Sequence, residues 1–390
     1  TFAFAVVIQN QSPLTTIQQW GDGFWGLLTF SMQMLLVLVT GFMLACTPLV
    51  KSLLERLASL AKSPGSAIVL VTLVSLIASW INWGFGLVVG ALFAKALARK
   101  VSVDYRLLVA SAYSGFIVWH GGLAGSVPLT IATPGHFSEA QIGVIGTGET
   151  IFSGFNLLLL AIMFVIIPLV NRLMLPPESE SIIVDSAKLQ DDALPSPTNE
   201  RPADKLENSK VLGLLVGFAG LAYLTNYFVS GGGLNLNIVN TLFLFLAIVL
   251  HGTPRNVLHS LQQAVQGGSG SVIQFPFYAG IMAVMVQSGL AQTMSEWLIS
   301  FASAESLPVW SFISAGIVNI FVPSGGGQWA VQAPVILPAA AELGAEINRV
   351  AMAVAWGDAW TNLIQPFWAL PVLAIAGLKA KDIMGFCLVQ

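Results

Sequence analysis

The sequence carries very little charge. Asp, Glu, Lys and Arg make up 9% of its 390 residues, whereas soluble proteins carry about a quarter. The net charge is −3 and no basic tract occurs, which argues against nucleic acid as a partner. Hydrophobic residues make up 55% and the mean hydropathy is +0.79, in continuous apolar runs without the alternation of a β-barrel. The sequence therefore predicts an all-α polytopic membrane protein that lies in a lipid bilayer.

Cysteine, histidine and the common catalytic motifs are also scarce. Cys46 and Cys387 form neither a disulfide nor a metal-binding pattern. None of the four histidines begins a His-Glu-x-x-His zinc motif, and neither a Gly-x-Ser-x-Gly elbow nor a phosphate-binding loop occurs. We therefore expect no enzyme and no cofactor, with a membrane-embedded sensor or enzyme as a remote alternative. The chain lacks an initial Met and stops within an apolar run, so both ends are expected to be incomplete.

The distribution of Lys and Arg predicts the topology, because cytoplasmic loops are enriched in positive charge. Segment 66–98 has basic residues on both flanks and an interruption at Asn82–Gly86, so we expect a re-entrant hairpin that opens to the cytoplasm. Segment 309–341, interrupted at Pro323–Trp329, is expected to start and end outside. The Pro-, Ser- and charge-rich segment 173–210 predicts a cytoplasmic linker between two halves.

The two halves carry the same series of segments, which predicts two inverted-topology repeats. The first, 1–172, has a scaffold span at 24–50, a hairpin at 66–98, a broken helix at 107–130 and a span at 151–172. The second half, 211–390, has spans at 211–228, 237–251 and 272–290, a hairpin at 309–341 and a broken helix at 350–376. At an offset of 241, Gly26 and Gln33 match Gly267 and Gln274. Inverted repeats with broken helices are typical of secondary transporters, with the site at the repeat interface.

The interruptions supply the candidate substrate-binding residues. A helix that starts at a hairpin tip presents unpaired N–H groups and partial positive charge, which favours a carboxylate ligand. His120 lies at the break of the first broken helix and could bond the substrate or carry a proton. The same glycines also suit close helix packing. The candidates are Asn82, Gly84, Gly86, His120, Ser324, Gly325, Gly326, Gly327 and Gln328.

Asp358 is the candidate for ion coupling, because a carboxylate at membrane depth is expensive and by default functional. It could bind Na⁺ together with backbone carbonyls and Asn362, or it could take up a proton. Gln365 precedes Pro366, which frees a backbone carbonyl one turn earlier. Na⁺ and H⁺ both stay open as the coupling ion. The candidate ion-coupling residues are Asn319, Asp358, Asn362 and Gln365.

No Lys or Arg lies in the middle of an expected span. Helix ends alone suffice for one carboxylate, so this absence favours a small monocarboxylate as substrate. A dicarboxylate or citrate carrier of the same architecture is the alternative. Four tryptophans could line an apolar wall for an acyl tail, although tryptophans also serve as packing or interface anchors; they are Trp329, Trp356, Trp360 and Trp368.

Five motifs, spread over nearly the whole chain, resemble the bacterial short-chain fatty acid transporters, a branch of a larger ion-transporter superfamily. They are Trp20–Trp25, Ile81–Ala91, Gln274–Gly280, Val322–Gly327 and Gln365–Pro371. The resemblance implies import of acetoacetate, butyrate and similar acids across the bacterial inner membrane. It also implies a homodimer, and an elevator movement in which hairpins and broken helices ride against a scaffold.

This chain departs from the family pattern at two candidate positions. The family usually has Gly where this chain has His120, and His where it has Gln328; Asp358 stands where the family has an acidic residue, often Glu. A proton role for His120 therefore does not follow from the resemblance, and Gln328 is expected to alter substrate preference.

Overall fold

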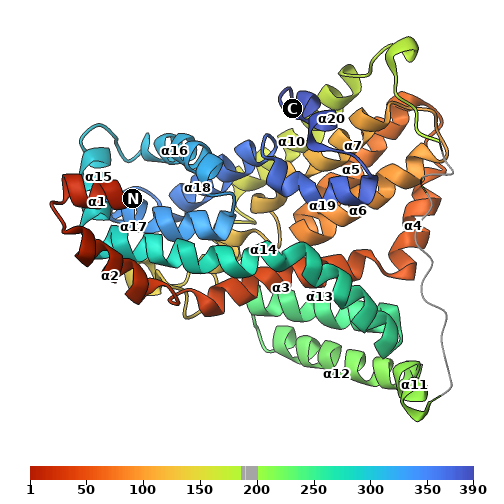
Figure 1. The fold of residues 1–390 in the computed structure, drawn as a ribbon, viewed down its shortest axis with the longest axis horizontal. Coiled ribbons are helices and arrows are strands. Elements are labelled where there is room, and N and C mark those ends of the chain that lie inside the picture. Colours follow the sequence, from red (N-terminus) through yellow and green to blue (C-terminus); the bar gives the residue numbers. More distant parts are fainter. Residues whose placement is uncertain (186–188, 190–200) are drawn as a thin grey trace.

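The computed structural model describes residues 1–185, 189 and 201–390, and within these ranges it contains helices and loops but no β-strand. Figure 1 shows an elongated molecule through which α3 (Leu28–Ala45) and α14 (Pro254–Gln287) run side by side. Among the described residues, five helical segments are long and apolar enough to cross a membrane, or six if α14 and the bent α15 (Leu290–Ile299) form one span. The chain is therefore an all-α integral membrane protein.

The other elements follow in chain order. The first half contains α1 (Phe2–Ile8), α2 (Pro13–Gly23), α4 (Pro48–Ala58), α5 (Pro64–Ile81), α6 (Trp83–Ala98), α7 (Tyr105–Ser114), the 3-10 helix η1 (Gly115–Gly121), α8 (Ser126–Ile131), α9 (Glu139–Ile142), η2 (Thr147–Glu149), α10 (Gly154–Leu173) and η3 (Glu178–Glu180). The second contains α11 (Pro202–Glu207), α12 (Lys210–Val229), α13 (Leu236–His251), α16 (Leu307–Phe321), α17 (Gly325–Leu343), α18 (Ile347–Asn362), α19 (Pro366–Ala376) and α20 (Ala380–Cys387).

Helices α5 and α6 are joined by a single residue, Asn82, and α16 and α17 by residues 322–324; we name these pairs hairpin 1 and hairpin 2. Asn82 Oδ1 accepts a hydrogen bond from Phe85 N at 2.9 Å, at the start of α6. Ser324 Oγ accepts one from Gly327 N at 3.2 Å, at the start of α17. Such caps satisfy N–H groups that a helix start leaves open. Each hairpin tip is therefore fixed by its own polar residue.

Helix α3 packs against both hairpin tips. A β-carbon on Gly84 of hairpin 1 would lie 2.8 Å from Leu38 Cα. A β-carbon on Gly326 of hairpin 2 would lie 2.6 Å from Phe30 Cζ. The missing side chains at these two glycines allow the tips to approach so closely. One helix outside the hairpins therefore forms a common contact surface for both of them.

Each half also contains a helix that is interrupted in its middle. Helix α7 tightens into η1, and residues 122–125 then leave the helix before α8 begins. Helix α18 ends at Asn362, and α19 begins at Pro366, which lacks the N–H that would continue the α18 ladder. Helix α18 packs tightly on α16, since a β-carbon on Gly357 would lie 2.2 Å from Phe312 O. Hairpin 2 and the second broken helix are thus closely joined.

The end of the second half packs on the first half. Figure 1 shows α19 and α20, in dark blue, beside α6 and α7. Tyr105 Oη, at the start of α7, donates a hydrogen bond to Ala376 O, at the end of α19, at 3.0 Å. Residues of the second half therefore form part of the packing around hairpin 1, and the two halves are not separate domains there.

Helix α14 differs from its sequence-based expectation. The expected span 272–290 is the second part of one helix that begins at Pro254. Thr253 Oγ1 accepts from Asn256 N at 3.3 Å, so a Thr cap and a Pro at the first position start the helix early. Gly289, in the left-handed region at φ +79°, then separates α14 from α15, and the two helices meet at a bend of 70°.

The linker expected at 173–210 is described only in part, since residues 186–188 and 190–200 lie outside the described residues. Its first part is attached to the start of α7, where Tyr105 N donates to Ile182 O at 2.9 Å and Ile182 N donates to Asp104 Oδ2 at 2.9 Å. Arg99 donates to Leu189 O at 2.7 Å. Ile182 and Leu189 of the linker therefore lie against the end of α6 and the start of α7.

Candidate functional site

Two buried titratable side chains from opposite halves of the chain form the centre of the candidate site. Nε2 of His120, in η1, lies 3.0 Å from Oδ1 of Asp358, in α18. The side chains are 0% and 1% exposed. A carboxylate removed from water at membrane depth is costly unless another polar group contacts it. The break in the first broken helix places His120 where it can meet this need.

Amide side chains surround Asp358 on its other sides. Asn362 Nδ2 donates to Asp358 Oδ1 at 2.8 Å. Asn319 Nδ2, from hairpin 2, lies 2.8 Å from Asp358 O, 2.8 Å from Thr361 Oγ1 and 3.0 Å from Asn362 Oδ1. Gln365 Nε2 donates to Asn319 O. The structure therefore brings together all four residues that the sequence suggests for ion coupling.

Oxygen acceptors outnumber hydrogen-bond donors at this centre. Within the described residues no donor reaches Asp358 Oδ2, Asn319 Oδ1 or Gln365 Oε1, although these atoms are buried. Asn319 Nδ2 has two hydrogens and cannot satisfy the three oxygens around it. Buried acceptors without donors are stabilised by positive charge, and carboxylate, amide and backbone oxygens are ligands for hard cations. The arrangement is therefore chemically suited to take up a cation.

The tip of hairpin 2 lies against the His120 side of this centre. A β-carbon on Gly325 would lie 2.2 Å from His120 Nε2 and 2.7 Å from Trp119 Cη2. Gly326 and Gly327 face aromatic rings of α3 and α14 instead. Of the three consecutive glycines, Gly325 is therefore the one that brings the tip to the buried pair.

The remaining predicted substrate-binding residues lie apart from the buried pair. Asn82 caps α6, and a β-carbon on Gly84 or Gly86 would overlap α3 or Ser79, so these glycines serve close packing. Gln328 Nε2 donates to Ala315 O at 2.9 Å inside hairpin 2. In this structure their observed contacts support the two hairpins, whereas His120 and Gly325 belong to the centre.

Sequence reasoning missed three supporting residues, namely Tyr113, Asn156 and Thr361. Tyr113 Oη donates to Asn362 O at 2.6 Å. Asn156 Nδ2 donates to Gly121 O at 3.0 Å, and its Oδ1 accepts from Trp356 Nε1 at 2.9 Å. A polar Asn156 within an apolar run was a usable signal. Tyr113 and Thr361 offered none, since both residue types are ordinary in membrane helices.

The four tryptophans expected to form one acyl wall are dispersed. Trp329 is buried in a second hydrophobic cluster with Ala333 and Leu337. Trp360 is 54% exposed and stacks on Phe312 with ring centroids 5.4 Å apart. Trp356 Nε1 donates a hydrogen bond to Asn156 Oδ1. Of the four, Trp368 is the one that packs on Trp83 at the tip of hairpin 1.

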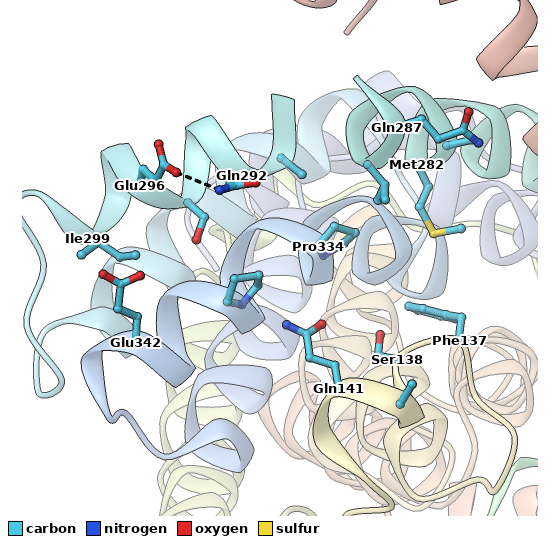
Figure 2. A pocket seen from close by; sticks show the side chains of 16 residues that line it. Phe137, Ser138, Gln141, Met282, Gln287, Gln292, Glu296, Ile299, Pro334 and Glu342 are labelled. Atoms are coloured by element: carbon cyan, nitrogen blue, oxygen red, sulfur yellow. Dashed lines mark hydrogen bonds between the residues drawn. The ribbon is translucent and has the colours of Figure 1, made fainter. Parts of the chain in front are cut away.

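A separate groove of about 720 Å³ lies between α14, α15, α17 and the segment 137–141, and Figure 2 shows its lining side chains. Gln292 Nε2 donates to Glu296 Oε1 at 3.0 Å on the α15 wall, and Glu342 lines the groove from α17. The groove has carboxylates in its lining but neither Lys nor Arg, which favours cations over anions. None of its lining residues belongs to the His120–Asp358 centre, so it is not the candidate site.

Comparison with known proteins connects the chain with transporters. The family model described as short chain fatty acid transporter matches residues 1–390. A provisionally named short-chain fatty acid transporter of Escherichia coli (strain K12) is 45% identical over 393 residues, which cover 100% of this chain and 89% of that protein. A provisionally named short-chain fatty acid transporter of Haemophilus influenzae is 42% identical over 404 residues, which cover 100% of this chain and 90% of that protein.

Among solved structures, that of the Alcanivorax borkumensis YdaH transporter is similar with a TM-score of 0.55 and 17% sequence identity, covering 96% of this chain and 84% of that chain. This likeness concerns the fold alone. The family and both sequence relatives are transporters, not enzymes. Because the family model matches the whole chain and both relatives exceed 40% identity, the chain belongs to the short-chain fatty acid transporter family.

Proposed function

We propose that the chain is a secondary active transporter that imports short-chain monocarboxylates, such as acetoacetate and butyrate, by symport with Na⁺ or H⁺. The observation that carries the proposal is the buried His120–Asp358 pair between two interrupted helices. The tip of hairpin 2 closes against this pair at Gly325. The contact between Gly325 and His120 supports a site in which the tip of hairpin 2 and the Asp358 carboxylate act together.

A cation is required on physical grounds. A bare substrate carboxylate faces a large desolvation cost inside the membrane, and the charge of Asp358 adds to it. A cation bound beside Asp358 offsets this charge. The donor-free oxygens of Asp358, Asn319 and Gln365 support Na⁺, and the Asp358–His120 hydrogen bond supports H⁺.

The movement we propose is an elevator step within two inverted repeats. Hairpin 1 and hairpin 2 re-enter the membrane from opposite sides, as the charges on their flanks suggest, and move with α7–α8 and α18–α19. The scaffold comprises α3, α13 and α14, which pack on one another. The protein acts as a homodimer in the bacterial inner membrane, with the segment 173–210 on the cytoplasmic side.

The test is uptake of labelled butyrate and acetoacetate into proteoliposomes with an imposed Na⁺ gradient, an imposed H⁺ gradient, or neither. We expect accumulation under one gradient only. Equal uptake in all three conditions contradicts symport. Uptake of labelled succinate or citrate that unlabelled butyrate does not reduce would favour a dicarboxylate or citrate carrier instead. Ligand binding without any flux would favour a membrane-embedded sensor.

A further inference from the structure

Four aromatic side chains meet where the interrupted elements come together. Trp83 begins α6 at the tip of hairpin 1, Phe116 and Trp119 lie in η1, and Trp368 lies in the first turn of α19. The ring centroids are 5.7 Å apart for Trp83 and Trp119, 5.5 Å for Trp83 and Trp368, and 5.9 Å for Trp119 and Trp368. Phe116 stacks on Trp119 at 5.2 Å. We name these four residues the aromatic cluster.

The aromatic cluster contacts the tips of both hairpins. Trp83 is itself the residue after the hairpin 1 tip, and Gly325 of hairpin 2 lies against the edge of Trp119. The His120 ring centroid is 3.6 Å from that of Trp119. A ligand held on the His120 side of the centre therefore lies beside the ring of Trp119.

The cluster also presents polar donors that the protein itself does not use. Trp83 and Trp119 are 5% and 1% exposed. Within the described part of the chain, no acceptor reaches Nε1 of either residue. Buried tryptophan N–H groups usually find a partner, and leaving one unpaired lowers stability. Two buried indole donors without an acceptor in one cluster, one of them in a ring beside His120, favour a place for the oxygens of a ligand.

We infer that the aromatic cluster is the acyl-binding wall of the transporter and limits the length of the acid that it accepts. Trp83 and Trp119 donate their indole N–H groups to substrate oxygens, while the aromatic cluster contacts the short hydrocarbon tail. This inference rests on the proposed function. It assigns the ligand contacts to Trp83, Phe116 and Trp119, which lie outside the four tryptophans that the sequence suggested.

The length limit follows from the packing behind Trp119. Phe116 is 0% exposed and its ring is nearly parallel to that of Trp119, at an interplanar angle of 7°. A longer tail would have to displace one of these buried rings, which a close-packed interior resists. A shorter residue at position 116 would provide the missing room.

The first experiment measures displacement of labelled butyrate from the purified protein by acetate, butyrate, hexanoate and octanoate. Phe116→Ala, and the milder Phe116→Leu, should raise the affinity for hexanoate relative to butyrate, by about tenfold for Ala, since each buried methylene contributes about fourfold. Phe243→Ala is the matched control, because Phe243 is a buried ring on α13 outside the cluster. It should leave the ratio unchanged.

The second experiment removes the indole donors and keeps a ring. Trp83→Phe and Trp119→Phe should lower the affinity for every acid alike, on the order of tenfold, because each variant loses a hydrogen bond to the charged carboxylate. Trp20→Phe is the control, since Trp20 packs on Phe24 at 4.8 Å in a different aromatic group. Its affinities should equal those of the unmodified protein.

The outcomes separate this inference from the proposed function. If the unmodified protein binds no monocarboxylate from acetate to octanoate, the proposed function and the inference both fail. If it binds and transports butyrate but both Phe116 variants keep the original length profile, the acyl wall is wrong and the transporter stands. If Trp83→Phe and Trp119→Phe match Trp20→Phe, the indole donors do not hold the substrate.

Discussion

His120 and Asp358 lie 238 residues apart in the sequence, yet their side chains are 3.0 Å apart and fully buried. The contact joins the interrupted helix of the first half to that of the second half. Asn362 holds the same carboxylate oxygen at 2.8 Å. A change in the charge of this one carboxylate is therefore felt by both broken helices.

We predict that Asp358→Asn abolishes cation-coupled uptake, with a loss of about a hundredfold or more. The substitution removes the negative charge that holds a cation beside the substrate, at a depth where charge interactions are strong. The measurement is butyrate uptake into proteoliposomes under Na⁺ and H⁺ gradients. Asp382→Asn is the control, because Asp382 lies outside the centre and caps α20 by accepting from Lys379 N at 2.8 Å.

The double variant Asp358→Asn with His120→Gln tests whether Asp358 and His120 act as a unit in transport. If they do, the losses of the single variants should not add, since contacting residues are energetically coupled. Coupled uptake that survives Asp358→Asn would mean that the residue is structural.

Gly325→Ala should reduce transport at least about tenfold. Its β-carbon would lie 2.2 Å from His120 Nε2, so either the hairpin tip or the imidazole must shift. Overpacking of this kind costs about 1–3 kcal/mol. Gly385→Ala is the control, because nothing lies within 4 Å of its β-carbon position. Unchanged butyrate kinetics in Gly325→Ala would show that the tip is not closed on His120 during transport.

A cross-link between hairpin 2 and α3 should block transport if the hairpins move against the scaffold. A β-carbon on Gly326 would lie 3.3 Å from Met34 Sδ, so cysteines at these two positions can be joined by a short bis(methanethiosulfonate) reagent. Each cysteine thiol forms a reducible disulfide with the reagent and releases methanesulfinate. The native cysteines, Cys46 and Cys387, are first replaced by Ser. We expect uptake to stop on cross-linking and to return on reduction.

The matched control for this cross-link joins Ser75 to Gly90, which face each other within hairpin 1. That bridge connects two parts of one proposed moving unit, so uptake should continue. Full uptake with the Gly326–Met34 bridge intact would argue against the elevator step.

Stability should depend on Asp104 at acid pH. Burial raises the pKa of Asp104, but hydrogen bonds from Arg106, Ile182 N and Leu107 N outweigh it and place the pKa below the usual 3.8. A depressed pKa stabilises the folded state above the unfolded-state pKa, and this contribution disappears as the pH falls through the folded-state pKa. Asp104→Asn should therefore unfold at a lower temperature at pH 6, by a contribution on the order of 1 kcal/mol.

The difference in melting temperature between Asp104→Asn and the unmodified protein should shrink as the pH is lowered from about 5 to below 3.8. Thermal unfolding in detergent across this range measures it. Asp22→Asn, at an exposed position, gives the reference curve. A difference that stays constant with pH would assign the effect to lost packing and not to charge.

The sequence was sufficient for those features that depend on local residue chemistry. The helix interruptions near Asn82, Ser324 and Gln365-Pro366 depend on Gly and Pro residues within a few positions, so they can be read from the chain. The apolar runs likewise predict the all-α membrane fold, which the structure and the family match confirm. The four ion-coupling candidates stood out because polar groups are rare in apolar runs.

The sequence was insufficient where distant residues decide the outcome. No local signal pairs His120 with Asp358, or gathers Trp83, Trp119 and Trp368 from three separate elements. The length of α14 was also missed, because its Gly- and Ser-rich stretch resembles a loop in sequence although a Thr253 cap starts the helix before it. Tertiary contacts bring together the two groups of residues, whereas the start of α14 is set by its local cap and its first-position Pro.

The close contact between α16 and α18 means that hairpin 2 and Asp358 move as one rigid unit. Gly357 rests on Phe312, and Gly316 rests on Trp360, so neither helix can slide without displacing the backbone or ring of the other. A rearrangement of hairpin 2 therefore carries the buried carboxylate with it. A fluorescent or spin label on the exposed side of α16, for example at Val309, would report the depth of Asp358 without touching the site.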